Sequence, residues 1–130
     1  MADYKVVKVS DVPDQGPNLG VAPDVEIRFL RNDLGCENCG VSYMRVGPNA
    51  RQKSGHRHKV QEEIYLLVSG SARVKVGDDV ISLEPWTAIR VPNEATRAFE
   101  AGPEGAEFVI VGAPNTGPGD AVEEDGFWTD

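Results

Sequence analysis

Two histidines and one glutamate give this sequence its clearest chemical signal. His56 and His58 are the only histidines of the chain, and Glu63 follows five residues after the second. Residues i and i+2 of a strand project from the same face, so the two imidazoles can lie side by side. A turn after His58 and a return on the antiparallel neighbour would bring Glu63 to that face. Two imidazoles and one carboxylate form a recurring ligand set for divalent metals, which predicts a metal site.

A second interpretation of these three residues stays open. Both imidazoles could bond to the Glu63 carboxylate in a site that holds no metal. The stretch from Arg45 to Gln61, which surrounds the histidine pair, contains five basic residues and no acid. These charges could draw an anionic ligand toward the site, or they could simply be solvated loop charges.

The elements that must hold these residues are short strands. Apolar or alternating runs are broken by Gly, Pro, Asn and Asp, among them Gly70 and the run from Gly102 to Gly105, which is typical of an all-β domain. Nothing in the interior has the period of a long amphipathic helix. Nine closely spaced strands predict a sandwich or a barrel. They are Val25–Leu30, Gly40–Val46, Ser54–His58, Glu63–Val68, Ala72–Val76, Val80–Leu83, Thr87–Val91, Thr96–Glu100 and Glu107–Val111.

The two ends of the chain differ from this interior. Residues 1–24 are predicted to form an N-terminal arm, in which Lys5–Val9 is strand-like and a Pro- and Gly-rich stretch follows. Residues 25–113 form the predicted barrel, and residues 114–130 form an acidic tail. The tail carries Phe127 and Trp128, and we expect these aromatic side chains to dock on this subunit or on a partner.

Length and charge exclude several classes of function. At 130 residues the chain fits one domain with a substantial core. A net charge of −8 argues against nucleic acid or an anionic membrane surface as the main partner. The sequence has no signal-peptide pattern and no apolar run long enough to span a bilayer, so a cytoplasmic location is the expectation.

Cys36 and Cys39 have the spacing of half a zinc ribbon or of a redox pair. The chain has no second cysteine pair, and two predicted strands flank the turn, whereas a redox motif leads from a strand into a helix. We therefore interpret the two cysteines as a reduced turn pair without a function.

The histidine region resembles the first motif of the cupin superfamily. That motif is a glycine, five residues, His-x-His, three or four residues, a glutamate, six residues and a glycine. His56, His58, Glu63 and Gly70 match it, and Ala50 stands where the first glycine would be. The resemblance covers roughly residues 25 to 113.

The second cupin motif is almost absent from the sequence. It consists of a glycine, five residues, Pro-x-Gly, two residues, a histidine, three residues and an asparagine. Trp86, Pro92, Glu94, Arg97 and Ala101 stand at these positions, so only the proline is kept. Arg97 therefore replaces the histidine with which metal-binding cupins usually complete their site.

The resemblance implies an all-β, single-domain cupin jelly-roll barrel, also called a double-stranded β-helix, with its pocket in the barrel mouth. A guanidinium stays protonated and has no acceptor, so Arg97 cannot bind a cation. The metal ligands that the resemblance carries over are therefore His56, His58 and Glu63. They would hold one divalent ion (Fe, Mn, Zn or Ni), or the protein is metal-free.

Four further side chains are candidates for the ligand pocket. Arg97 either grips a carboxylate or phosphate of the ligand or forms an internal salt bridge with Glu63. Strand alternation from Glu63 and from Arg97 points Tyr65 and Phe99 inward, where they could line a pocket with Met44. Ordinary core filling is the alternative for Phe99 and Met44. Core filling explains Tyr65 less well, because its hydroxyl would need a partner, and Tyr65 is also a candidate catalytic acid or base.

The sequence leaves three functions open. The first is a small cupin that binds a small, anionic ligand, with a divalent metal and oxygenase- or isomerase-type chemistry. The second is a non-enzymatic metabolite-binding or sensing module without metal. The third is a metal-free sugar- or acid-modifying enzyme that uses Tyr65 and a histidine as acid and base. We also expect a homodimer, in which the N-terminal arm crosses to cover the edge strands of a second barrel.

Overall fold

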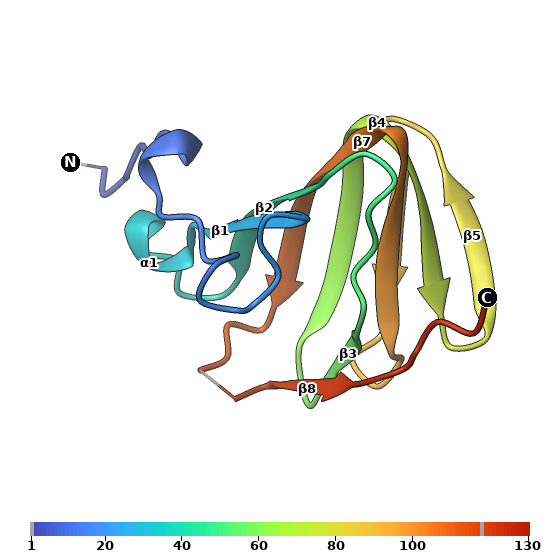
Figure 1. Ribbon diagram of the computed structural model, residues 1–130. Coiled ribbons are helices and arrows are strands. Elements are labelled where there is room, and N and C mark those ends of the chain that lie inside the picture. Colours follow the sequence, from blue (N-terminus) through green and yellow to red (C-terminus); the bar gives the residue numbers. More distant parts are fainter. Residues whose placement is uncertain (1, 118) are drawn as a thin grey trace.

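An antiparallel sheet of eight strands curls into a jelly-roll barrel in the computed structural model, which describes residues 2–117 and 119–130 (Figure 1). The predicted all-β fold is confirmed. The strands are β1 (Val25–Phe29), β2 (Gly40–Val46), β3 (Gly55–His58), β4 (Glu62–Val76), β5 (Asp79–Leu83), β6 (Ala88–Val91), β7 (Arg97–Ala113) and β8 (Ala121–Glu124). The helices are a 3₁₀ turn (Val9–Asp11) and the one-turn α1 (Arg31–Leu34). None of the described helices is long and apolar enough to cross a membrane.

The two long strands β4 and β7 form the spine of the barrel. They pair antiparallel from Glu62 opposite Ala113 to Val76 opposite Arg97. The first half of β4 also pairs with β6, and its second half pairs with β5. Strands β2 and then β1 extend the sheet from β7, and β3 joins β7 where His56 lies opposite Arg97. The histidine-bearing strand is therefore held on the main sheet.

Two predicted strand breaks are wrong. The segments on either side of Gly70 belong to one strand, β4, and those on either side of Gly102–Gly105 belong to β7. The pairing of β4 with β7 shifts register between Leu67 and Ser69 and again between Gly70 and Ala72. Gly70 has φ +83° and Gly105 has φ +79°, which favours glycine, so the strands bend there without leaving the sheet.

Aromatic side chains fill the centre of the barrel, as strand alternation predicts. The ring of Phe99 lies between those of Tyr65 and Phe108, with centroids 4.5 and 4.8 Å away. All three side chains are buried, as are Leu67 and Val74 on the inner face of β4. This packed layer forms the core of the barrel, and Tyr65 joins it to the cavity that His56 and His58 line.

The N-terminal arm covers an edge of its own barrel. Lys5–Val9 is not a strand, and the 3₁₀ turn starts at Val9. Further along, one carboxylate oxygen of Asp14 accepts hydrogen bonds from Gly16 N at 2.8 Å and from Ile27 N at 3.0 Å. Gln15 N donates to Ile27 O at 2.8 Å. The open edge of β1 is therefore blocked by the same chain, which reduces the need for a second barrel to cover it.

The acidic tail is part of the barrel. Residues 121–124, for which no strand was predicted, form β8 and pair with β3. Phe127 is buried, and the indole Nε1 of Trp128 donates to Gln52 O at 2.7 Å. Both aromatic side chains therefore dock on this subunit.

Candidate metal centre

Strands β3 and β4 bring His56, His58 and Glu63 together. The chain reverses through residues 59–61, so β3 delivers both imidazoles and the start of β4 delivers the carboxylate. Glu63 Oε1 lies 3.0 Å from His58 Nε2 and 3.6 Å from His56 Nε2, and one ligand atom from each residue lies within 4.8 Å of the others. Metal–ligand bonds of about 2.0–2.2 Å separate neighbouring ligand atoms by roughly 3.0–3.5 Å. The three atoms are therefore spaced to share one ion.

The imidazole of His58 lies between two carboxylates. Its Nδ1 is 2.9 Å from Asp120 Oδ2, so the Nδ1–H donates there and Nε2 turns toward Glu63. This buried Nε2 has no hydrogen-bond partner among the described residues, although Glu63 Oε1 is only 3.0 Å away. A cation between these two atoms, a proton or a metal ion, would satisfy both, and the contact as it stands is poorly aligned for a direct hydrogen bond.

The electrostatics of the site suit a cation. Burial opposes the charge of Glu63, but interactions with His56, His58 and Tyr65 outweigh it and hold the Glu63 pKa well below its usual range. Burial likewise opposes the charge of His58, yet the Glu63 and Asp120 carboxylates raise the His58 pKa. Glu63 is thus ionised at neutral pH, as a metal ligand must be. A metal held here would have to displace the proton from His58, so its affinity would rise with pH through the His58 pKa.

Tyr65 contacts the candidate ligand Glu63 directly. Its hydroxyl donates to Glu63 Oε1 at 2.5 Å, and its side chain is buried. Burial, and then the neighbouring Glu63 charge, raise the Tyr65 pKa well above its ordinary value, so the hydroxyl stays protonated. In this geometry Tyr65 orients the carboxylate. Its role as a catalytic residue stays a prediction.

Arg97 is buried with carbonyl partners. It has 0% exposure, and its guanidinium donates to His56 O at 3.4 Å, Val91 O at 3.4 Å and Pro92 O at 3.2 Å. None of the ion pairs of the described residues includes Arg97, so the bridge to Glu63, one of its two predicted roles, is not formed, and the guanidinium contacts carbonyls instead. The charge of Arg97 nevertheless acts on His58, whose pKa it lowers. The grip of Arg97 on a ligand anion stays a prediction.

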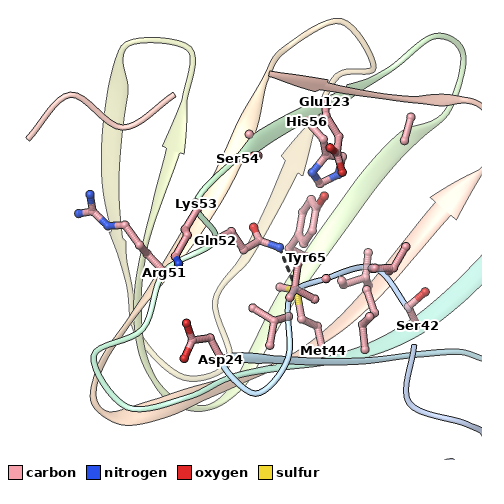
Figure 2. Close-up of a pocket in the computed structure, with 18 of the residues that line it drawn as sticks. Asp24, Ser42, Met44, Arg51, Gln52, Lys53, Ser54, His56, Tyr65 and Glu123 are labelled. Atoms are coloured by element: carbon pink, nitrogen blue, oxygen red, sulfur yellow. Dashed lines mark hydrogen bonds between the residues drawn. The ribbon is translucent and has the colours of Figure 1, made fainter. Parts of the chain in front are cut away.

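A cavity of about 520 Å³ opens beside the three candidate ligands (Figure 2). His56 and Tyr65 lie at one end of it, and Asp24 and Arg51 lie at the other. The wall between them is mainly apolar and includes Val25, Ile27, Phe29, Met44 and Ile110. Of the four predicted pocket residues, Tyr65 and Met44 line the cavity, whereas Phe99 and Arg97 lie outside its wall. Phe99 instead fills the core.

Sequence reasoning missed two carboxylates that the tail brings to the site. Asp120 bonds to His58 and also accepts hydrogen bonds from Val60 N at 3.0 Å and Gln61 N at 3.3 Å. Glu123 lies opposite His56 in the pairing of β8 with β3 and lines the cavity (Figure 2). Both belong to residues 120–130, whose composition is typical of a solvated acidic tail. This stretch contains no basic residue, so its carboxylates need cationic partners elsewhere in the chain, and that is the one signal in the sequence that could have indicated these contacts.

Among the described residues, the cysteine pair is not part of the His56–His58–Glu63 cluster. Cys36 and Cys39 are free and half-buried between α1 and β2, and burial raises the Cys36 pKa, which makes the thiol less reactive.

We expect the Cys36→Ser/Cys39→Ser protein to keep its metal content and to have a free energy of unfolding within about 0.5 kcal/mol of that of the wild type. Elemental analysis and urea unfolding check this. Loss of bound zinc or collapse of the barrel would show that the pair has a structural role.

Comparisons with known proteins agree on the fold. Oxalate decarboxylase from Bacillus subtilis at pH 4.6 superimposes with a TM-score of 0.80 and 21% identity, over 95% of this chain and 32% of that one. A point mutant of the Bacillus subtilis enzyme superimposes with a TM-score of 0.79 and 21% identity, over 95% of this chain and 33% of that one. KdgF from Halomonas sp. superimposes with a TM-score of 0.63 and 14% identity, over 88% of this chain and 90% of that one. No family model and no curated protein sequence matches the chain.

These likenesses show a cupin fold. Both oxalate decarboxylase and KdgF are cupins, so the structure bears out the fold that the first motif suggested. The chain spans about a third of the oxalate decarboxylase chains, and identity below a quarter carries nothing about substrate. The chemistry must therefore be argued from the residues of the site.

Proposed function

We propose that this chain is a metal-dependent cupin, which holds one divalent transition-metal ion through His56, His58 and Glu63 and binds a small, anionic ligand beside it. One observation carries the proposal: the buried, unpartnered Nε2 of His58 faces the ionised Glu63 at 3.0 Å. A metal ion would satisfy both atoms. Two histidines and a carboxylate suit Fe, Mn, Zn or Ni better than the hard cations Mg²⁺ and Ca²⁺.

The cavity supports a ligand next to the ion. Three protein ligands leave positions open in any four- to six-coordinate metal site, and His56, His58 and Glu63 all lie on the cavity wall. A bound metal supplies positive charge at that end. At the other end Lys53 lines the wall, is exposed, and takes part in none of the ion pairs that the described residues form. Lys53 and Arg51 there offset the carboxylate of Asp24, so the charge of the metal at the first end is what favours an anion.

The ligand set also favours catalysis over simple binding. Two histidines and one carboxylate with open positions are the ligands of non-haem iron oxygenases, and a metal at this place would act as a Lewis acid toward a bound oxygen atom. The apolar wall would exclude water from the reacting end of the ligand. Oxygenase- or isomerase-type chemistry is therefore the class that we propose.

Calorimetric titration of the metal-free protein tests this function. Zn²⁺, Mn²⁺ and Fe²⁺ are expected to bind with a stoichiometry of one ion per chain. Small carboxylates should then shift the ligand-field absorption of the Co²⁺-loaded protein, because they would enter open positions at the metal. Carboxylates that bind equally well without metal would instead favour the metal-free binding module.

Replacement of Arg97 by histidine is expected to strengthen Zn²⁺ binding about tenfold or more, which corresponds to about 1.4 kcal/mol. Arg97→His removes a buried positive charge that acts on His58 and places an imidazole opposite His56. Arg97→Gln is the matched control, because it removes the charge without adding a ligand, and it should give a smaller gain. Unchanged affinity in both variants would show that the Arg97 charge does not oppose the metal.

A homodimer is also proposed. Tyr4 and Val6 in the N-terminal arm are 76% and 88% exposed, which leaves apolar surface that a second copy could cover. Light scattering should then give twice the mass of one chain, and deletion of residues 2–9 should reduce the measured mass to that of one chain. A monomer mass that does not change on concentration of the full chain would contradict the proposal.

A further inference from the structure

Residues 120–130 lie along one end of the barrel, beside the strand that carries both candidate histidine ligands (Figure 1). Strand β8 pairs with β3 residue by residue, from Ala121 opposite His58 to Glu124 opposite Gly55. Asp120 precedes this pairing and contacts His58 itself. The segment therefore lies directly on the metal-binding strand.

Beyond β8 the same segment is anchored by two aromatic residues. Phe127 is buried against Gly55, where an added Cβ would lie 2.7 Å from the Phe127 ring, and Lys75 Nζ donates to Phe127 O at 2.5 Å. The ring of Trp128 stacks on the Arg51 guanidinium with 4.1 Å between them. The missing side chain of Gly55 thus leaves the space that the Phe127 ring fills. This close packing shows that the segment is docked on the barrel.

Charge complementarity strengthens the second anchor. Asp130 pairs with Arg51 at 3.1 Å and with Arg73 at 3.3 Å, and Glu100 pairs with the same two arginines. Arg51 also lines the cavity. The end of the chain therefore contacts the rim of the ligand cavity as well as the strand that carries the metal ligands.

We propose that Asp120 is a positioning residue for the metal ligand His58 and links that ligand to the docked segment 120–130, so that metal binding and docking of this segment stabilise each other. The inference rests on the proposed function. Asp120 fixes the ring of His58 with Nδ1–H inward and Nε2 free for the metal, as outer-shell carboxylates do for metal-bound histidines.

Asp120 also fixes the connection between the ligands. Its two oxygens accept the backbone N–H groups of Val60 and Gln61, which lie in the turn between His58 and Glu63. One carboxylate thus controls both the orientation of an imidazole and the distance from that imidazole to the third ligand. Loss of such a partner commonly weakens metal binding about 10- to 100-fold, and we expect a loss in this range for Asp120→Ala.

The coupling is reciprocal by thermodynamic necessity. If docking of residues 120–130 raises metal affinity by some factor, metal raises the docking equilibrium by the same factor. Trp128 is a natural reporter, because its indole is bonded to Gln52 O in the docked segment. The other tryptophan, Trp86, is 74% exposed and can be removed by Trp86→Phe.

The test compares Zn²⁺ binding in four full-length proteins that carry Trp86→Phe: the parent, Asp120→Ala, Asp120→Asn and Glu124→Ala. Glu124 is the matched control, since it is exposed on β8 and forms no side-chain hydrogen bond or ion pair among the described residues. Calorimetry gives the affinity, Trp128 fluorescence gives docking, and Co²⁺ absorption gives the metal geometry. Thermal unfolding in EDTA confirms that each protein is folded.

We expect about 10- to 100-fold weaker Zn²⁺ binding in Asp120→Ala, a smaller loss in Asp120→Asn, which keeps an acceptor for Nδ1–H, and no change in Glu124→Ala. Zn²⁺ should make Trp128 less accessible to a quencher in the parent but not in Asp120→Ala, and the Co²⁺ spectrum should change with the Asp120 variants. A parent that binds Zn²⁺ with Asp120→Ala binding equally well overturns this inference alone. A parent that binds no Zn²⁺ overturns the proposed metal function, and this inference with it.

Discussion

Replacement of His58 by alanine is expected to weaken Zn²⁺ binding at least about a hundredfold, because a lost ligand costs more than a lost outer-shell partner. The His58 ring is held between Asp120 and Glu63 at 2.9 and 3.0 Å. Its removal leaves one imidazole and one carboxylate, too few to hold a transition metal tightly. Calorimetric titration of the metal-free proteins gives the affinity ratio.

Arg57→Ala is the control for this variant. Arg57 lies between the two histidines on β3, is exposed, and points to the opposite face of the strand. The Arg57→Ala protein should therefore bind Zn²⁺ with the affinity of the wild type. Glu63→Gln should reproduce the loss seen for His58→Ala with a different side chain, so a folding defect in one variant cannot mimic the result. Zn²⁺ affinity within about threefold of wild type in both variants would place the metal elsewhere or nowhere.

Replacement of Gly70 by alanine is expected to destabilise the barrel by about 3 kcal/mol or more, a cost typical of severe backbone strain with a clash. Gly70 lies at the bend of β4 with φ +83°, and an added Cβ would lie 1.9 Å from the backbone oxygen of Gly105. Neither strand of the spine can move without disturbing the β4–β7 pairing. Urea unfolding followed by circular dichroism measures the loss.

Gly77→Ala separates the clash from the backbone conformation. Gly77 also has a positive φ, +56°, but a Cβ there would meet nothing within 4 Å. Its replacement should cost only the left-handed conformation, about 1–2 kcal/mol. If the two variants unfold at the same urea concentration, the close approach of β4 to β7 at Gly70 is not what demands glycine there.

Much of the fold follows from local pattern in the sequence. The spacing of His56 and His58 on a strand, with Glu63 on the next, predicts three side chains on one face, and the fold brings these three together. Turn residues mark the strands correctly where the chain leaves the sheet. At Gly70 and Gly105 the same residue type marks a bend within a strand, and composition alone does not separate these cases.

The rest of the site depends on contacts that no local pattern encodes. Asp120 reaches His58 across 62 residues of sequence, through the pairing of a short acidic strand with β3. Arg97 suggests an anionic partner, yet backbone carbonyls at the end of β6 and on β3 surround its guanidinium. Both outcomes are set by how distant segments pack on the barrel, because strand periodicity fixes a face but not the neighbour opposite it.

The metal content of the protein, purified without a histidine tag, tests the central claim most directly. Elemental analysis after loading with excess Zn²⁺ and exhaustive dialysis should give one ion per chain for the wild type and none for His58→Ala, because His56, His58 and Glu63 are the one candidate metal cluster among the described residues. A wild type that retains no metal after this treatment would contradict the account. So would a His58→Ala protein that retains a full equivalent.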